Sequence, residues 1–150
     1  KTTLTVGLLR KGWSLLSDEI APLSGKGTVR PFPRCPGASA TTLKLLAWPT
    51  EKTAHVYLNN TFCLLPSDLN VAAEDSYPVD GGVFVERSDL ASLVPMDSAQ
   101  GVTKLLKMMK GQANPKTAFE TAGRIAETAT FHSLKNGDLS QTIDLVETLK

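Results

Sequence analysis

The chain has 150 residues, and its 16 Lys and Arg residues against 15 Asp and Glu residues give a formal net charge of +1. That balance argues against a dedicated nucleic-acid-binding protein, which usually carries a concentrated excess of basic side chains. No apolar run approaches the roughly 18 residues of a membrane span, so we expect no membrane partner. The length and the 41% share of apolar residues suit a single domain over residues 1–150.

Cysteine and histidine are rare in the chain. Cys35 and Cys63 form neither a metal-ligand spacing with His55 and His132 nor a disulfide framework. We therefore expect two free thiols in a cytoplasmic protein. His55 lies in an alternating segment, which favours a hydrogen-bonded surface histidine over a catalytic one.

A helix and a short strand are expected first along the chain. Leucines recur at helical spacing over residues 1–11, and Gly12 can adopt the left-handed conformation that ends a helix. The apolar run at residues 13–16 fits a buried strand. The acidic pair Asp18 and Glu19 follows that run directly.

Extended segments and turns are expected in the middle of the chain. Residues 20–23 are predicted to be extended, and residues 24–27 form a Ser-Gly-Lys-Gly turn. Residues 28–32 are predicted to be an edge strand, because the prolines in and after them cannot donate to a central ladder. The alternation at residues 54–58 is typical of a half-exposed strand, and residues 66–80 have a loop composition.

A strand and a capped helix are expected in the next part of the chain. The strand covers residues 82–86. Asp97 is placed to cap the helix, with Gln100 in capping-box register and Gly111 at the helix end.

Two more helices with a strand between them are expected at the end. Asn114 and Pro115 start the first of these helices. The strand covers residues 128–134, and Asp138 with Gln141 caps the last helix. The residues expected to face the core are Phe119, Ala122, Ile125 and Ala126 on the first helix and Leu139, Ile143 and Val146 on the second.

The first two residues match the end of a phosphate-binding P-loop, G-x-x-x-x-G-K-[ST]. In that motif the lysine reaches the β- and γ-phosphates, the next hydroxyl binds Mg²⁺, and the helix start supplies N–H groups and positive charge. Lys1 and Thr2 would take these roles, with Thr3 beside them in the nucleotide site. Many helices begin with Lys-Thr, so the pair is weak by itself. We expect the glycine loop and a first strand immediately before Lys1.

Asp18 and Glu19 strengthen the P-loop interpretation. The strand that follows a P-loop helix returns its carboxyl end to the phosphate edge of the sheet. Carboxylates at that edge can bind Mg²⁺ and accept the proton of an attacking hydroxyl. We predict that Asp18 accepts the proton and Glu19 supports the metal, while the reverse assignment stays open. The alternative is an acidic pair in a solvated turn.

Three segments carry a resemblance to a known family: KTTL at residues 1–4, LLSDE at residues 15–19 and VRPFPR at residues 29–34. They resemble the HPr kinase-related P-loop kinases, whose members typically read GKSTL, then LLSDD, then VxPFPR. The match is specific over residues 1–34 and looser over residues 81–150. It implies an α/β P-loop kinase domain of the HPr kinase type, with a mixed sheet and flanking helices. That core is shared with HPr kinase/phosphorylase and the ATP-dependent phosphoenolpyruvate carboxykinases.

The resemblance also implies an activity. ATP would be the phosphoryl donor, Mg²⁺ the cofactor, and a serine hydroxyl of a small protein or precursor peptide the acceptor. Arg30 and Arg34 would neutralise the transferred phosphoryl group or bind an acidic substrate; exposed arginines beside prolines are the alternative. Glu19 stands where the family often has a second aspartate. The basic loop with which HPr kinase contacts its protein substrate has no recognisable copy here.

Two other functions stay open from the sequence. The chain could be a catalytically degenerate relative that binds a nucleotide or a peptide without transfer. It could also be a P-loop nucleotidase that hydrolyses its nucleotide to drive a conformational change. ATP and GTP are not distinguished, and the family resemblance allows a homo-oligomer.

Overall fold

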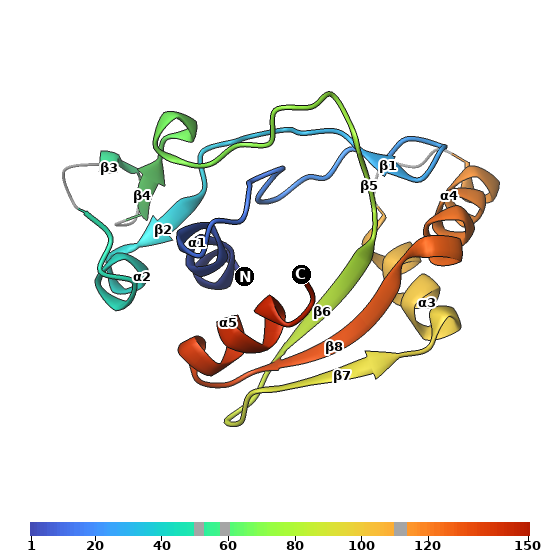
Figure 1. Cartoon of the computed structure of the whole chain (residues 1–150). Coiled ribbons are helices and arrows are strands. Elements are labelled where there is room, and N and C mark those ends of the chain that lie inside the picture. Colours follow the sequence, from blue (N-terminus) through green and yellow to red (C-terminus); the bar gives the residue numbers. More distant parts are fainter. Residues whose placement is uncertain (50–52, 58–60, 110–113) are drawn as a thin grey trace. The chain divides into compact units, whose positions relative to one another are not determined.

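The computed structural model describes residues 1–49, 53–57, 61–109 and 114–150. They form a mixed α/β structure of small sheets with flanking helices (Figure 1). The mixed α/β class predicted from the sequence is therefore confirmed.

The described residues cluster into two compact units. Unit 1 consists of Lys1–Ala21 and Pro31–Glu74, and unit 2 consists of Pro22–Arg30 and Asp75–Lys150. The chain thus leaves unit 1, contributes one short segment to unit 2, and returns. A single domain over residues 1–150 stays a prediction.

Unit 1 combines helices with a small antiparallel sheet. Its elements are α1 (Thr2–Arg10), β2 (Gly37–Ser39), α2 (Ala40–Leu45), β3 (Thr53–Tyr57), β4 (Thr61–Leu64) and the 3₁₀ turn η2 (Pro66–Asp68). The strand order is β2-β4-β3, and both pairings are antiparallel. The predicted strand at residues 54–58 is confirmed as β3; residue 58 lies outside the described residues.

The helix α1 ends as the sequence predicts, but the strand after it does not form. Gly12 has φ +89°, the left-handed conformation that glycine adopts without strain. The strand predicted at residues 13–16 is wrong: Leu15 makes a single parallel bridge to Val71. Leu15 alone in that run is buried, so too little apolar surface is covered to extend the ladder.

The helix α2 is an element that the sequence patterns do not predict. Ser39 caps it, because its side-chain oxygen accepts a hydrogen bond from the backbone N–H of Thr42 at 3.1 Å. Thr42 and Leu43 are its buried residues. The helix is only six residues long, so its apolar periodicity is too brief to recognise.

Unit 2 contains two small sheets and the remaining helices. Its elements are β1 (Thr28–Val29), β5 (Tyr77–Pro78), β6 (Gly81–Arg87), β7 (Ser92–Met96), α3 (Ser98–Met108), α4 (Pro115–Thr128), β8 (Thr130–Asn136) and α5 (Leu139–Glu147). The edge strand predicted at residues 28–32 is confirmed in a shorter form as β1, which pairs with β5. The strand β5 lies in the segment predicted to be a loop.

The larger sheet of unit 2 has the order β6-β8-β7 (Figure 1). The central strand β8 is parallel to β6 and antiparallel to β7, and its Leu134 is fully buried between Val85 and Leu93 in register. The strand predicted at residues 82–86 is confirmed as β6, and the one predicted at residues 128–134 forms two residues later as β8, because Thr128 still belongs to α4. The strand β7 is not predicted from the sequence, because Pro95 argues against a strand; an edge position tolerates it.

The predicted helix caps are confirmed. Asp97 accepts from the backbone N–H of Gln100 at 2.9 Å, and Asp138 accepts from that of Gln141 at 3.0 Å. Asn114 accepts from the N–H of Lys116 at 2.9 Å and caps α4 ahead of its first-turn proline. The predicted stop at Gly111 lies outside the described residues, and α3 ends at Met108.

The buried face of α4 differs from the prediction. Phe119 is 63% exposed, so its predicted burial is wrong. Ala122 and Ile125 are buried as expected, together with Ala118 and Thr121, whereas Ala126 is only partly buried. The four buried residues are spaced three or four positions apart, so they form one stripe along the helix. Phe119 lies outside this stripe, and burying it would require the helix to rotate about its axis.

The hairpin Pro22–Arg30 packs on α4 within unit 2. Leu23 pairs with Val29 in an antiparallel bridge, and the turn of residues 24–27 forms as predicted. Gly27 has φ +79°, and a Cβ there would lie 3.5 Å from the side chain of Ile125. Arg124 donates through Nη1 to the carbonyl oxygen of Gly25 at 2.7 Å. The hairpin tip is therefore fixed against the helix.

We expect Gly27→Ala to destabilise the protein by about 1 kcal/mol, because an L side chain is strained at this φ. The atoms around the added Cβ lie at ordinary van der Waals distances. The loss of stability would therefore come from backbone strain and not from a steric clash. Gly25→Ala is the matched control: its φ is not left-handed and nothing lies within 4 Å of the added Cβ. Urea denaturation of both variants measures the difference. Equal midpoints would contradict the strain argument.

Candidate functional site

The start of α1 carries the residues expected to bind phosphates. Lys1 occupies the N-cap position, and its carbonyl oxygen accepts the N–H of Thr5 at 3.0 Å. The N–H groups of the first helical turn have no partner inside the helix, and the helix dipole adds positive charge there. Lys1 is exposed and Thr2 is partly exposed, so both can be reached by a ligand.

Asp18 lies within electrostatic reach of Lys1 in unit 1. Partial burial, and secondly the charge of Glu19, raise the pKa of Asp18 above its ordinary value. The positive charge of Lys1 acts in the opposite direction on the same pKa. The charge of Lys1 thus acts on a carboxylate 17 positions away in the sequence, and Asp18 lies in a loop and not at a strand end.

Glu19 and Arg34 form an ion pair. The Nη1 of Arg34 lies 3.1 Å from Oε2 of Glu19, and both side chains are exposed. Two residues predicted for different tasks, metal support and phosphate contact, therefore neutralise each other. An exposed pair of this kind contributes little stability and can exchange partners when a ligand arrives.

Thr3 has a structural partner. Its hydroxyl lies 3.0 Å from that of Thr42, which lies 3.0 Å from the hydroxyl of Ser39. This chain of hydroxyls joins the first turn of α1 to the N-terminus of α2. The hydroxyl of Thr3 therefore has a hydrogen-bond partner within unit 1, so its backbone N–H is the group that could bind a nucleotide.

Arg30 does not belong to the same unit as the other candidates. It ends the hairpin of unit 2, whereas Lys1, Asp18 and Arg34 are in unit 1. The backbone of His55 lies in β3, and its side chain is outside the described part of the structure.

Ser17 is a residue of this region that the sequence did not single out. Its Oγ is buried and has no hydrogen-bond partner among the described residues. A buried hydroxyl without a partner carries an energetic cost, which a bound water or ligand would remove. The signal in the sequence was its place next to Asp18, inside the LLSDE segment.

The protein ligands for Mg²⁺ at this site are few. Among the described residues, no group of three or more His, Cys, Asp or Glu side chains could hold a metal. Magnesium in nucleotide sites is usually bound through one or two carboxylates plus phosphate oxygens and water, so a larger protein cluster is not required. The carboxylate of Asp18 and the hydroxyl of Thr2 are ligands of the type that this way of binding Mg²⁺ needs. Glu19 fits it only when released from Arg34.

The two cysteines lie next to each other in unit 1. Cys35 is exposed and Cys63 is buried, and both are free. Burial, and secondly a hydrogen bond with Cys35, raise the pKa of Cys63 to about 11. Cys63 is therefore protonated and unreactive at neutral pH.

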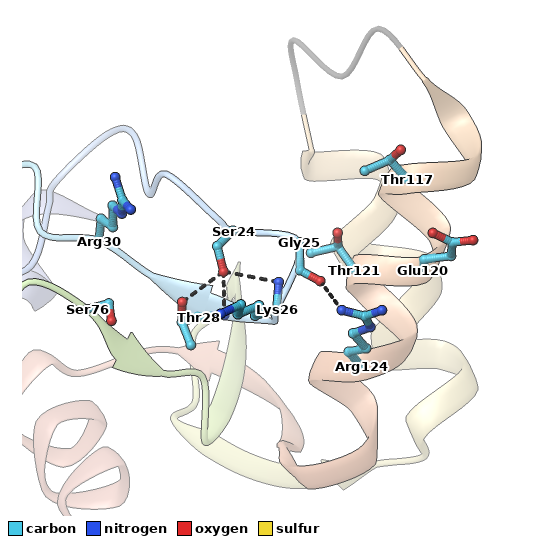
Figure 2. Close-up of a pocket in the computed structure, with 10 residues that line it drawn as sticks. All are labelled: Ser24, Gly25, Lys26, Thr28, Arg30, Ser76, Thr117, Glu120, Thr121 and Arg124. Carbon is cyan, nitrogen blue, oxygen red and sulfur yellow. Dashed lines mark hydrogen bonds between the residues drawn. The ribbon is translucent and has the colours of Figure 1, made fainter.

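A polar cavity of about 570 Å³ lies in unit 2 (Figure 2). It is lined by the hairpin tip around Ser24, by Ser76, and by the N-terminal half of α4. Arg30 is among its lining residues. The sequence named Arg30 as a candidate but gave no sign of this cavity, because its walls come from three separate segments.

The sequence matches no family model, no curated protein and no solved structure.

None of the helices in the described segments has the length and apolar character needed to cross a membrane.

We expect Asp18→Asn to raise the free energy of unfolding at pH 7, measured without nucleotide or Mg²⁺. A raised folded-state pKa stabilises the fold only below the unfolded pKa of about 3.9, and that contribution is lost as the pH rises through the folded pKa. The uncharged amide avoids the penalty at neutral pH. The gain should be modest, because Asp18 is only partly buried.

The pH dependence separates this effect from a change in packing. Urea denaturation of both proteins should give curves that converge near pH 3, where the aspartate is protonated. A gain of equal size at pH 3 and pH 7 would mean that charge is not its origin.

Proposed function

We propose that the chain is part of an ATP-dependent kinase that transfers the γ-phosphoryl group to a hydroxyl, in the first instance a serine of a small protein or precursor peptide. The observation that carries the proposal is the electrostatic interaction of Lys1, at the start of α1, with Asp18 in the same unit. The finer fold of the proposal is a P-loop kinase domain of the HPr kinase type, and the proposed location is cytoplasmic.

Each residue has a task in the proposed transfer. Lys1 and the N–H groups at the start of α1 bind the nucleotide phosphates and neutralise their charge. Asp18 accepts the proton of the acceptor hydroxyl while the new O–P bond forms and ADP leaves with the bridging oxygen. Arg34, when it exchanges Glu19 for a phosphate oxygen, adds charge-assisted hydrogen bonds.

Magnesium is the cofactor of the proposal. Thr2 would hold it, with Glu19 in support, and in the reversed assignment Asp18 would take the place of Glu19. The ion would neutralise charge that develops on the phosphate oxygens. Phosphoryl transfer requires little covalent chemistry from the protein, so positioning and charge neutralisation carry the rate enhancement.

The second candidate is a degenerate module that binds a nucleotide or peptide without transfer. The ion pair between Glu19 and Arg34 favours it. The charge of each side chain is neutralised by the other and is then not available to a metal or a phosphate. The missing strand before Asp18 favours it too, since a loop positions a base less rigidly. A P-loop nucleotidase is the third candidate.

Incubation with labelled ATP, Mg²⁺ and the products of neighbouring genes tests the proposal. Mass spectrometry that locates a new phosphate on a serine supports the kinase. ATP turnover without any acceptor indicates the nucleotidase. Binding without turnover indicates the degenerate module, and the residues directly before Lys1 give an independent criterion, because a degenerate loop would lack the glycines.

A further inference from the structure

The cavity in unit 2 has a pre-built wall on the hairpin side. The N–H of Ser24 bonds to the carbonyl oxygen of Thr28 at 2.8 Å, and Ser24 Oγ accepts from the N–H groups of Lys26 and Thr28 at 3.1 and 3.3 Å. The hydroxyls of Ser24 and Thr28 lie 2.8 Å apart. Figure 2 shows this cluster below the hairpin tip and the bond from Arg124 to the carbonyl of Gly25. The tip is therefore rigid before any ligand binds.

Positive charge dominates the lining. Lys26, Arg30 and Arg124 line the cavity, against a single carboxylate from Glu120. Glu120 also lies 3.9 Å from Lys116 on the same helix, which offsets part of its charge. Within the part of the chain that the structure describes, Lys26 and Arg30 make no ion pair. The cavity thus has cationic side chains that no protein group neutralises.

Hydroxyl groups complete the lining. Ser76 comes from the segment before β5, and Thr117 and Thr121 come from successive turns of α4. Arginine, lysine and hydroxyl donors from separate elements line this one cavity, and together they suit an anionic molecule with several acceptor oxygens. The volume lies within the roughly 300–1,000 Å³ range of small-molecule sites.

We propose that this cavity binds a small phosphorylated molecule, which is attracted by the charges of the lining residues Lys26, Arg30 and Arg124 and lies against the threonines of α4. A phosphate monoester carries nearly two negative charges and more acceptor oxygens than a carboxylate, so it matches the three cations better. This site does not depend on the proposed kinase activity, because none of the residues assigned to transfer at α1 lines it.

Titration calorimetry with glycerol 3-phosphate and with inorganic phosphate tests the site. Arg30→Gln and Lys26→Gln should each weaken binding about tenfold or more, as the loss of a charge-assisted hydrogen bond does. Neither side chain has an ion-pair partner among the described residues, so both variants should keep the wild-type thermal midpoint. Lys107→Gln is the control: it removes an exposed cation of α3 that does not line the cavity, and should leave binding within twofold.

The measurements are repeated in the Lys1→Ala background, so that phosphate bound at the start of α1 does not count. Persistent binding there, still weakened by Arg30→Gln, supports the site whether or not the protein is a kinase. Equal binding of inorganic phosphate and the ester also supports it and identifies the phosphate group as the recognised part. The proposal is overturned if neither probe binds at millimolar concentration, if glycerol binds as well as its phosphate, or if Lys107→Gln weakens binding as much as the cavity variants.

Discussion

Lys1→Ala is expected to abolish detectable phosphoryl transfer and to weaken nucleotide binding. The ammonium group is the positive charge proposed to lie nearest the transferred phosphoryl group, where negative charge develops in the transition state. Removing a single preorganised electrostatic donor costs roughly 10²–10³-fold in turnover in other enzymes. Turnover of labelled ATP with acceptor and the affinity for ATP measure the two effects.

Arg10→Ala is the matched control for Lys1→Ala. It removes an exposed cation from the last turn of the same helix, so it changes the net charge equally but leaves the N-terminus of α1 intact. We expect it to keep turnover within a few-fold of wild type. Transfer that survives Lys1→Ala, or that is lost equally in both variants, would remove the P-loop assignment.

Asp18→Asn is expected to lower turnover by roughly 10²-fold or more while ATP affinity changes much less. The amide keeps the shape of the side chain but cannot accept the proton of the acceptor hydroxyl, and general-base help is typically worth 10²–10⁴-fold. Single-turnover kinetics at saturating ATP isolate this step. Because the same substitution should raise stability at pH 7, lost activity could not be attributed to unfolding.

Glu19→Gln separates the roles of the two carboxylates. If Asp18 is the base, Glu19→Gln should mainly weaken Mg²⁺-nucleotide binding, and it also releases Arg34 from its ion pair. If Asp18→Asn instead mainly weakens Mg²⁺-nucleotide binding while Glu19→Gln mainly slows transfer, the roles are swapped. A kinase whose activity is insensitive to both substitutions would use another site.

Most residues of the candidate site could be named from the sequence, but the contacts that they make with one another could not. KTTL and LLSDE mark Lys1, Thr2, Asp18 and Glu19 because these motifs are contiguous. The ion pair of Glu19 with Arg34 spans 15 positions, and its formation depends on the path of the loop between them. The lining of the cavity in unit 2 spans 100 positions, from Ser24 to Arg124, so no local sequence pattern indicates it.

The sequence by itself determined the N-terminal caps of α3, α4 and α5 and the glycine that follows α1. The caps at Asp97, Asn114 and Asp138 and the left-handed Gly12 each depend on side chains and dihedral angles within a few residues, so neighbouring letters decide them. Local sequence likewise predicted the strands β3, β6 and β8, the first of them from its alternation.

Only the tertiary structure decided which strands pair and which faces are buried. The central place of β8, parallel to β6 and antiparallel to the unpredicted β7, requires surfaces that meet across 35 to 49 positions of sequence. Phe119 stays exposed because Ala118, Ala122 and Ile125 let α4 approach its neighbours closely, and Leu15 forms a single bridge because little else in its run is covered. Burial is a property of the partner surface as well as of the segment, so such outcomes are fixed only when distant segments pack together.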